Sequence, residues 1–176
     1  ALHGTHSSPL QTAFDGKTPR KLAPHIYRFV RKAWRVAMKP APLLASNKAF
    51  PKLFVRGGVK LGVMEPSLDV DVFFDMGQDW VALNLDQYCS LFEALERHDV
   101  RDVLPTLELP VLVINGSRDQ FTPPRFGEEI AKEVQNGENF TLPGGTHFGL
   151  IEYPDAVNRR LRAFLDDKVW PAPPAA

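Results

Sequence analysis

The stretch Val111-Leu-Val-Ile-Asn-Gly-Ser-Arg-Asp119 sets the fold class of this chain. Its first four residues form a continuous apolar and mostly β-branched run, which is typical of a strand buried on both faces of a parallel sheet. Asn115-Gly116 ends the run, because this dipeptide favours a turn. A shorter run around Asn139 to Leu142 leads into Pro143-Gly-Gly145 in a similar way. We therefore expect two parallel strands that each open into a loop.

Helical patterns alternate with these strands. Thr122 followed by Pro123 and Pro124 predicts a helix start. Its apolar positions are Phe126, Ile130, Ala131 and Val134. Pro154 and Asp155 begin a last helix, and its apolar side carries Val157, Leu161, Phe164 and Leu165. The order strand, helix, strand, helix is that of a βαβα unit in a doubly wound α/β fold. Because two parallel strands do not form a stable sheet alone, we expect further strands from an N-terminal segment or a companion chain.

Upstream of His98 the sequence favours helices and loops. Residues 24–39 place apolar side chains on one helical face and basic side chains on the opposite one. Proline and glycine interrupt residues 41–66, which allows only short helices there. Two more helices are expected, one within residues 67–82 and one around residues 86–97. Residues 20–98 are therefore predicted to be an all-helical block.

Composition is that of an ordinary globular domain, with 176 residues, 44% hydrophobic and 24% charged. No apolar run approaches the roughly 18 residues that a membrane span needs. Cys89 is the one cysteine, which favours a reducing compartment such as the cytoplasm, and we interpret it as a small buried hydrophobe. Because the chain begins with Ala1 rather than methionine, we interpret its start as processed or truncated.

Charge is distributed unevenly although the net charge is zero. Residues 1–60 hold twelve Lys and Arg residues and one acidic residue. Residues 61–176 hold nine Lys and Arg residues and twenty Asp and Glu residues. The basic helix at 24–39 could contact an anionic membrane surface, but a solvated face of a helical cap is the preferred interpretation. Nucleic acid is not expected as a partner, because the acidic part would repel phosphates.

Asp119 and His147 are the candidate catalytic residues. In open α/β sheets reacting side chains gather beyond the carboxyl ends of the strands. Asp119 follows the first strand, and His147, in Gly144-Gly-Thr-His147, follows the second. Adjacent parallel strands would bring the two loops together. The carboxylate could then accept the imidazole proton and direct the other ring nitrogen toward a nucleophile.

Three segments resemble the closing third of α/β hydrolases: Leu109 to Pro124, Pro143-Gly-Gly-Thr-His147-Phe and Glu152-Tyr-Pro. The resemblance implies that Asp119 is the triad acid and His147 the general base. It also implies four regions: a loop after a sheet strand at 1–19, a helical cap at 20–98, the C-terminal βαβα part of the core at 99–168, and a flexible tail at 169–176.

The family's nucleophile elbow, usually Gly-x-Ser-x-Gly, does not occur in this sequence, because none of its serines lies between two glycines at that spacing. We therefore expect the nucleophile outside the chain, either a serine for acyl transfer or an aspartate for alkyl transfer. No cofactor or metal is expected. His3 and His6 are three residues apart, but Gly4 and the loop composition argue against a helical metal site.

Two functions remain open. One is a hydrolase of an ester-like or other small apolar substrate, acting through a nucleophile-His-Asp triad and completed by the missing half. Its cap could line a pocket with Phe73, Phe74, Trp80 and Phe92, although these aromatic residues could equally pack the cap internally. The other is a non-catalytic, hydrolase-like structural or assembly subunit, whose basic and acidic faces would bind partners.

Overall fold

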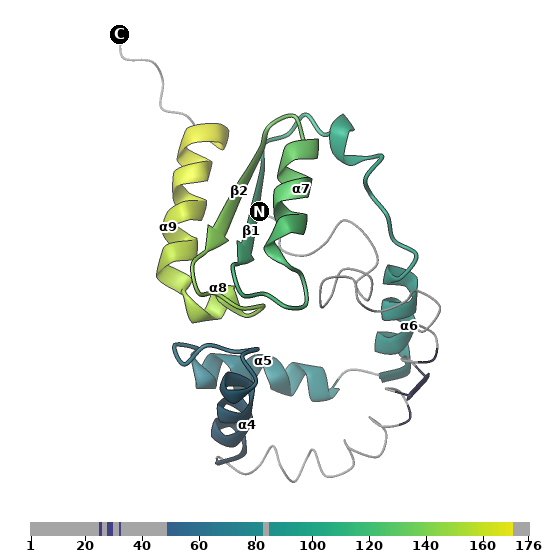
Figure 1. The fold of residues 1–176 in the computed structure, drawn as a ribbon, viewed down its shortest axis with the longest axis vertical. Coiled ribbons are helices and arrows are strands. Elements are labelled where there is room, and N and C mark those ends of the chain that lie inside the picture. Colours follow the sequence, from purple (N-terminus) through teal and green to yellow (C-terminus); the bar gives the residue numbers. More distant parts are fainter. Residues whose placement is uncertain (1–24, 26–27, 30–31, 33–48, 83–84, 171–176) are drawn as a thin grey trace.

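The computed structural model describes residues 25, 28–29, 32, 49–82 and 85–170 (Figure 1). Helices dominate the first part, and strands and helices alternate after residue 110. The helices are α4 (Ala49–Lys60), α5 (Val70–Ala82), α6 (Leu85–Leu95), α7 (Pro124–Glu133), α8 (Gly149–Glu152) and α9 (Pro154–Phe164). The strands are β1 (Val111–Gly116) and β2 (Gly137–Leu142). A 3-10 turn at Leu104–Thr106 precedes β1, and a π-helical turn at Leu165–Val169 follows α9.

The two strands are parallel and directly hydrogen-bonded. Val111 lies opposite Gly137 at one end, and Gly116 lies opposite Leu142 at the other. Both strands therefore end at the same edge of the sheet. The predicted α/β fold with parallel strands is confirmed. β2 begins at Gly137, two residues before the run that indicated it in the sequence.

Both faces of β1 are buried. Successive side chains of a strand point to opposite faces, so its residues pack into two different clusters. Val113 packs with Ile130, Ala131 and Val134 around α7. Leu112 and Ile114 pack on the opposite face with three further buried residues, Leu142, Val157 and Phe164. Figure 1 shows α7 and α9 on either side of the strands. The uninterrupted apolar run of β1 therefore reflects helices on both faces.

Helices α4 and α5 lie beneath the ends of the strands in Figure 1. Their core is a separate small cluster of Val55, Met64 and Leu68, against which Phe148 and Ile151 pack from the segment after β2. This cluster joins the helical part of the chain to the loop that carries His147.

Helix α4 is longer than the sequence predicted. Only short helices were expected in residues 41–66, but α4 spans twelve residues. Pro51 lies in its first turn, where a missing backbone N–H breaks no helical hydrogen bond. Gly58 is accommodated because Met64 fills the space beside it, and a Cβ there would lie 2.5 Å from the methionine sulfur.

Several predictions concern residues outside the described part. The loop at 1–19 and residues 171–176 of the tail are among them, and only four residues of the predicted helix at 24–39 are described. One of them, Phe29, is 72% exposed. The division into a loop, cap, core and tail stays a prediction.

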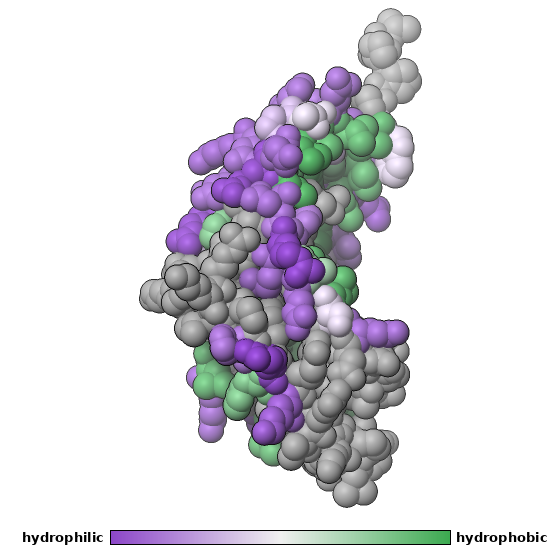
Figure 2. Space-filling view, turned by 90° about the vertical axis from the view of Figure 1, so that its right-hand side faces the viewer, coloured by the Kyte–Doolittle hydropathy of each residue, from purple (hydrophilic) through white to green (hydrophobic). Residues whose placement is uncertain are grey.

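Polar side chains cover most of the coloured surface in Figure 2, and apolar ones gather along one edge of its upper part. Among the described residues, no helix is both long and apolar enough to cross a membrane.

Candidate active site

Asp119 lies in the loop after β1 and is only 3% exposed. Its Oδ1 accepts hydrogen bonds from the backbone N–H groups of Phe121 and Thr122, both at 2.8 Å. Its Oδ2 accepts the hydroxyl of Thr122 at 2.5 Å. The carboxylate thereby folds its own loop back onto itself, as Asp often does in turns. The direction in which Asp119 points is fixed by this local network.

His147 lies in the loop after β2 and meets Asp119 directly. Its Nδ1 is 2.9 Å from Asp119 Oδ2, and its side chain is 35% exposed. An ionised carboxylate only accepts hydrogen bonds, so Nδ1 carries the proton and donates it. Nε2, on the opposite edge of the ring, is then the nitrogen that could accept a proton. The structure thus joins the two residues that the sequence predicted would meet.

Two opposing effects act on the pKa of the Asp119 carboxyl. Burial raises it, because a charged carboxylate loses hydration. The hydrogen bond and positive charge that His147 can provide lower it, as do the hydrogen bonds from Thr122. The lowering effects prevail, and the pKa of Asp119 lies below its ordinary value of 3.8. Asp119 is therefore a carboxylate at neutral pH.

Glycines let the two loops approach each other closely. A Cβ at Gly116 would lie 2.2 Å from the carbonyl oxygen of Gly145, so only glycine fits at the end of β1. Backbone hydrogen bonds then join the loops, from Ser117 N–H to Leu142 O and from Arg118 N–H to Gly145 O, both at 2.9 Å. Gly144 has a φ of 78°, a conformation that favours glycine.

Aromatic rings surround the histidine. Phe121 and Phe148 meet the His147 ring edge-on, with centroids 5.3 and 5.8 Å away. Phe73 of α5 meets Phe148 in turn at 5.1 Å. Phe73 is thus in the apolar cluster that joins α4 and α5 to the histidine loop. Of the other predicted pocket residues, Phe74 is half-buried, and the side chains of Trp80 and Phe92 lie outside the described part.

Comparison with known proteins assigns the chain to a family. Residues 73–175, more than half of the chain, match the model of an α/β-hydrolase family described as TAP-like protein. The chain belongs to this α/β-hydrolase family. The match contains both Asp119 and His147.

Two relatives resemble this chain in parts of its sequence. It is 42% identical over 56 residues to BpoC of Mycobacterium tuberculosis, which is named as a non-heme bromoperoxidase. That match covers 32% of this chain and 21% of BpoC. It is 28% identical over 74 residues to a pimeloyl-[acyl-carrier protein] methyl ester esterase of Neisseria meningitidis. That match covers 42% of this chain and 29% of the esterase.

Solved structures share the fold of this family member. An esterase from Exiguobacterium antarcticum superposes with a TM-score of 0.60 at 18% identity, over 90% of this chain and 54% of the esterase. The BpoC structure gives a TM-score of 0.53 at 22% identity, over 81% of this chain and 53% of BpoC. The chain spans about half the length of these structures.

Two residues that hold the candidate site were not recognised in the sequence. Thr122 was used only to predict the start of the next helix, and α7 does begin two residues later, at Pro124. The residue before α7 is Pro123, without a side-chain cap, and the Thr122 hydroxyl binds Asp119 instead. Glu152 received no role, yet it is buried and binds Thr146 beside the histidine.

Within the described residues, no group of three His, Cys, Asp or Glu side chains could hold a metal ion. His3 and His6 lie outside that part, as does the side chain of Cys89.

Proposed function

We propose that this chain supplies the acid and the histidine of a hydrolase triad whose nucleophile lies outside the chain. The observation that supports the proposal is the 2.9 Å contact between Asp119 Oδ2 and His147 Nδ1 at the carboxyl ends of two adjacent strands. The order acid before histidine, with one helix and one strand between them, agrees with the family's chain order.

In this proposal His147 transfers protons and Asp119 holds it in the active tautomer. Asp119 accepts the Nδ1 proton, so Nε2 takes the proton from a serine nucleophile and returns it to the leaving group. The nucleophile forms a bond to the substrate as the leaving group departs. Nε2 then deprotonates the water that releases the enzyme-bound group. An aspartate nucleophile would need His147 only in this second step.

The proposed substrate is a small apolar ester or a related compound. Phe121 and Phe148 flank the histidine, and Phe121 is partly exposed, so apolar surface lies beside the proposed reacting atom. Similarity to proteins named as esterases supports ester chemistry. We further propose that α4 and α5 are part of a cap over the strand-end loops.

Ester hydrolysis by the natural full-length protein tests the proposed triad. A panel of short-chain p-nitrophenyl esters serves as substrate, and His147→Gln is compared with His98→Gln. We expect kcat/KM to fall about 1,000-fold or more for His147→Gln, because the general base is lost. His98 is exposed and lies in the segment after α6, outside the loops that carry Asp119 and His147, so its variant should retain wild-type activity. Equal activity of both variants and the wild type would exclude the proposed role of His147.

An organophosphorus ester that labels activated serines identifies the nucleophile. Labelling of an elbow serine in the full-length protein, and its loss in His147→Gln, would support acyl transfer. Covalent trapping of an elbow aspartate by an alkyl halide or epoxide would support alkyl transfer instead.

A non-catalytic subunit is the second candidate, because the sequence contains no Gly-x-Ser-x-Gly motif. The intact mass and N-terminal peptide of the protein from its native source separate the two candidates. A longer product with an elbow, or a companion chain that carries one, supports the hydrolase. A product that begins at Ala1 without such a companion supports the subunit.

A further inference from the structure

Glu152, at the end of α8, is a buried carboxylate that the triad does not use. It is 4% exposed, and both its oxygens accept hydrogen bonds. Oε2 accepts from the Thr146 backbone N–H at 2.8 Å, and Oε1 accepts from the Thr146 hydroxyl at 2.6 Å. Thr146 directly precedes His147. Glu152 therefore holds the backbone and the side chain of the residue that leads into the histidine.

The same carboxylate also reaches the helical part of the chain. Oε1 accepts a third hydrogen bond, at 2.9 Å, from the backbone N–H of Glu65, which is 87 residues away in sequence. Glu65 lies in the α4–α5 turn, which we define as residues 61–69. Glu152 thus joins the α4–α5 turn to the histidine loop through a pair of backbone amides.

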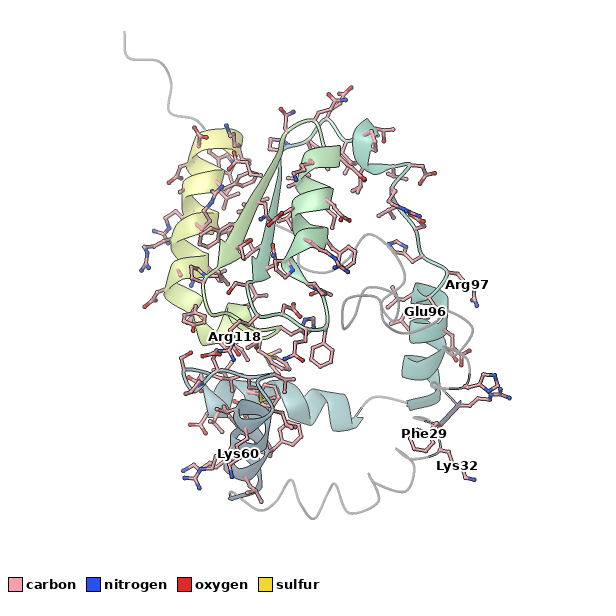
Figure 3. All side chains as sticks on the ribbon, in the orientation of Figure 1. Phe29, Lys32, Lys60, Glu96, Arg97 and Arg118 are labelled. Atoms are coloured by element: carbon pink, nitrogen blue, oxygen red, sulfur yellow. The ribbon has the colours of Figure 1, made fainter. Side chains whose placement is uncertain are left out.

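Contacts from the loop after β1 reinforce this junction. The Glu65 carboxylate forms an ion pair with Arg118, which immediately precedes Asp119. Gln120 Nε2 donates to the carbonyl oxygen of Gly62 at 3.2 Å. Figure 3 shows Arg118 between the strand-end loops and helices α4 and α5. The α4–α5 turn therefore contacts the loops of both candidate catalytic residues.

We propose that Glu152 is a positioning residue that couples the α4–α5 turn to the placement of His147. All three groups that contact its oxygens are donors, so the site requires a carboxylate, which offers acceptors at both oxygens. A glutamine at this position would direct N–H donors at another donor and lose at least one of the three hydrogen bonds. Buried donors left without an acceptor are costly, and the loops would move to satisfy them with water.

Amide hydrogen exchange in the full-length protein measures this coupling. In Glu152→Gln the side-chain carbonyl can replace only one of the two carboxylate oxygens, so the amide of either Thr146 or Glu65 faces the new NH2 group. We expect exchange at that amide to accelerate at least about tenfold. The amides of Leu112 and Val113 in β1 should keep their wild-type rates. Wild-type exchange at both Glu65 and Thr146 would overturn the proposal.

If Glu152→Gln unfolds the protein, two less disruptive variants of Thr146 test the same hydrogen bonds. Thr146→Val removes one donor and keeps the shape of the side chain, and Thr146→Ser keeps the hydroxyl. We expect faster exchange at the position-146 amide in Thr146→Val and rates near those of the wild type in Thr146→Ser. Identical behaviour of the two variants would contradict the role of this hydrogen bond.

A kinetic measurement tests whether the coupling affects catalysis. This test rests on the proposed function. Glu152→Gln should lower kcat, because His147 is no longer held. Glu108→Gln changes an exposed glutamate that precedes β1, at the strand end away from both loops, so its kcat should be that of the wild type. Equal losses of kcat in both variants would contradict the assignment to Glu152.

The two proposals fail in distinguishable ways. Accelerated exchange in a protein without esterase activity would refute the hydrolase but leave the coupling intact. Unchanged exchange in an active enzyme would refute the coupling alone.

Discussion

Asp119 is oriented by contacts within its own loop, independently of His147. Two backbone N–H groups and the Thr122 hydroxyl bind its oxygens, and His147 adds a further contact at Oδ2. A carboxylate that is held this way needs no rearrangement to orient an imidazole, and such preorganisation lowers the cost of catalysis. The hydroxyl and amide donors also keep the charge on Asp119 stable in a buried position.

The lowered pKa of Asp119 predicts how stability depends on pH. A group whose pKa is lower in the folded state stabilises the fold above its ordinary pKa, and this contribution disappears as the pH falls through the folded value. We expect Asp119→Asn to unfold more easily than the wild type at pH 6, by about 1–3 kcal/mol. The difference should shrink as the pH falls below the ordinary value of 3.8.

Thermal unfolding monitored by circular dichroism from pH 2 to pH 7 measures this difference. Asp102→Asn is the control, since Asp102 is exposed, and its curve should stay close to that of the wild type throughout. A gap between Asp119→Asn and the wild type that persists undiminished at pH 2 would show that charge is not its cause.

The sequence allowed the meeting of Asp119 and His147 to be predicted, because each follows a strand that periodicity reveals. Thr122 and Glu152 could not be predicted in the same way. A threonine before two prolines looks like a helix cap, and a glutamate near a helix end looks like a surface residue. Their partners, Asp119 and the Glu65 amide, are apparent only once the loops are placed in three dimensions.

The end of β1 and the histidine loop pack backbone against backbone. Gly116 leaves room for the carbonyl oxygens of Gly145 and Thr146, which would lie 2.2 and 2.5 Å from a Cβ at this position. Backbone atoms cannot rotate away as a flexible side chain can. This contact therefore sets how closely the loops of Asp119 and His147 approach each other.

We expect Gly116→Ala to destabilise the protein by about 1–3 kcal/mol, the usual range for overpacking. Gly57→Ala is a matched control, because Gly57 lies in α4 and a Cβ there has nothing within 4 Å. Alanine is a better helix former, so this variant should gain about 0.5–1 kcal/mol. Urea unfolding gives both values. A Gly116→Ala variant that is as stable as the wild type would refute the steric argument.

Helices and strands with a clear hydrophobic pattern in the sequence were predicted well. Elements that depend on tertiary contacts were not. β1, α7 and α9 follow from apolar runs and spacings in the sequence. Helix α4 was expected to be short because Gly57 and Gly58 lie inside it, yet Met64 packs against Gly58 and supports the helix. Helix α8 has four residues, too few to give a recognisable pattern.

The described part of the molecule contains one central core and one peripheral cluster. The two faces of β1 anchor the central core, and Leu112 and Val113 are fully buried. The peripheral cluster has three buried residues, Val55, Met64 and Leu68, while Leu53 and Leu61 nearby are largely exposed. Fewer buried contacts permit local opening at lower free energy.

We therefore expect the amides of α4 to exchange faster than those of β1 in the wild type. Val55→Ala should accelerate exchange in α4, α5 and the segment after β2 that packs against them, whereas Val113→Ala should lower the global free energy of unfolding by about 2 kcal/mol. Native-state hydrogen exchange at several low urea concentrations resolves the two kinds of opening. A single rate change across all elements in Val55→Ala would mean that the two parts unfold together.

The parallel register separates the candidate active site from the opposite end of the sheet. β1 and β2 carry the Asp119 and His147 loops at one end, and the connection at 134–136 turns back at the other, roughly 17 Å away along a six-residue strand. Gln135 is exposed there. A dye or a surface tether attached at this position would lie at the strand end opposite the Asp119 and His147 loops and would leave their contacts with α4 and α5 undisturbed. The protein could thus be immobilised for a biosensor in a defined orientation.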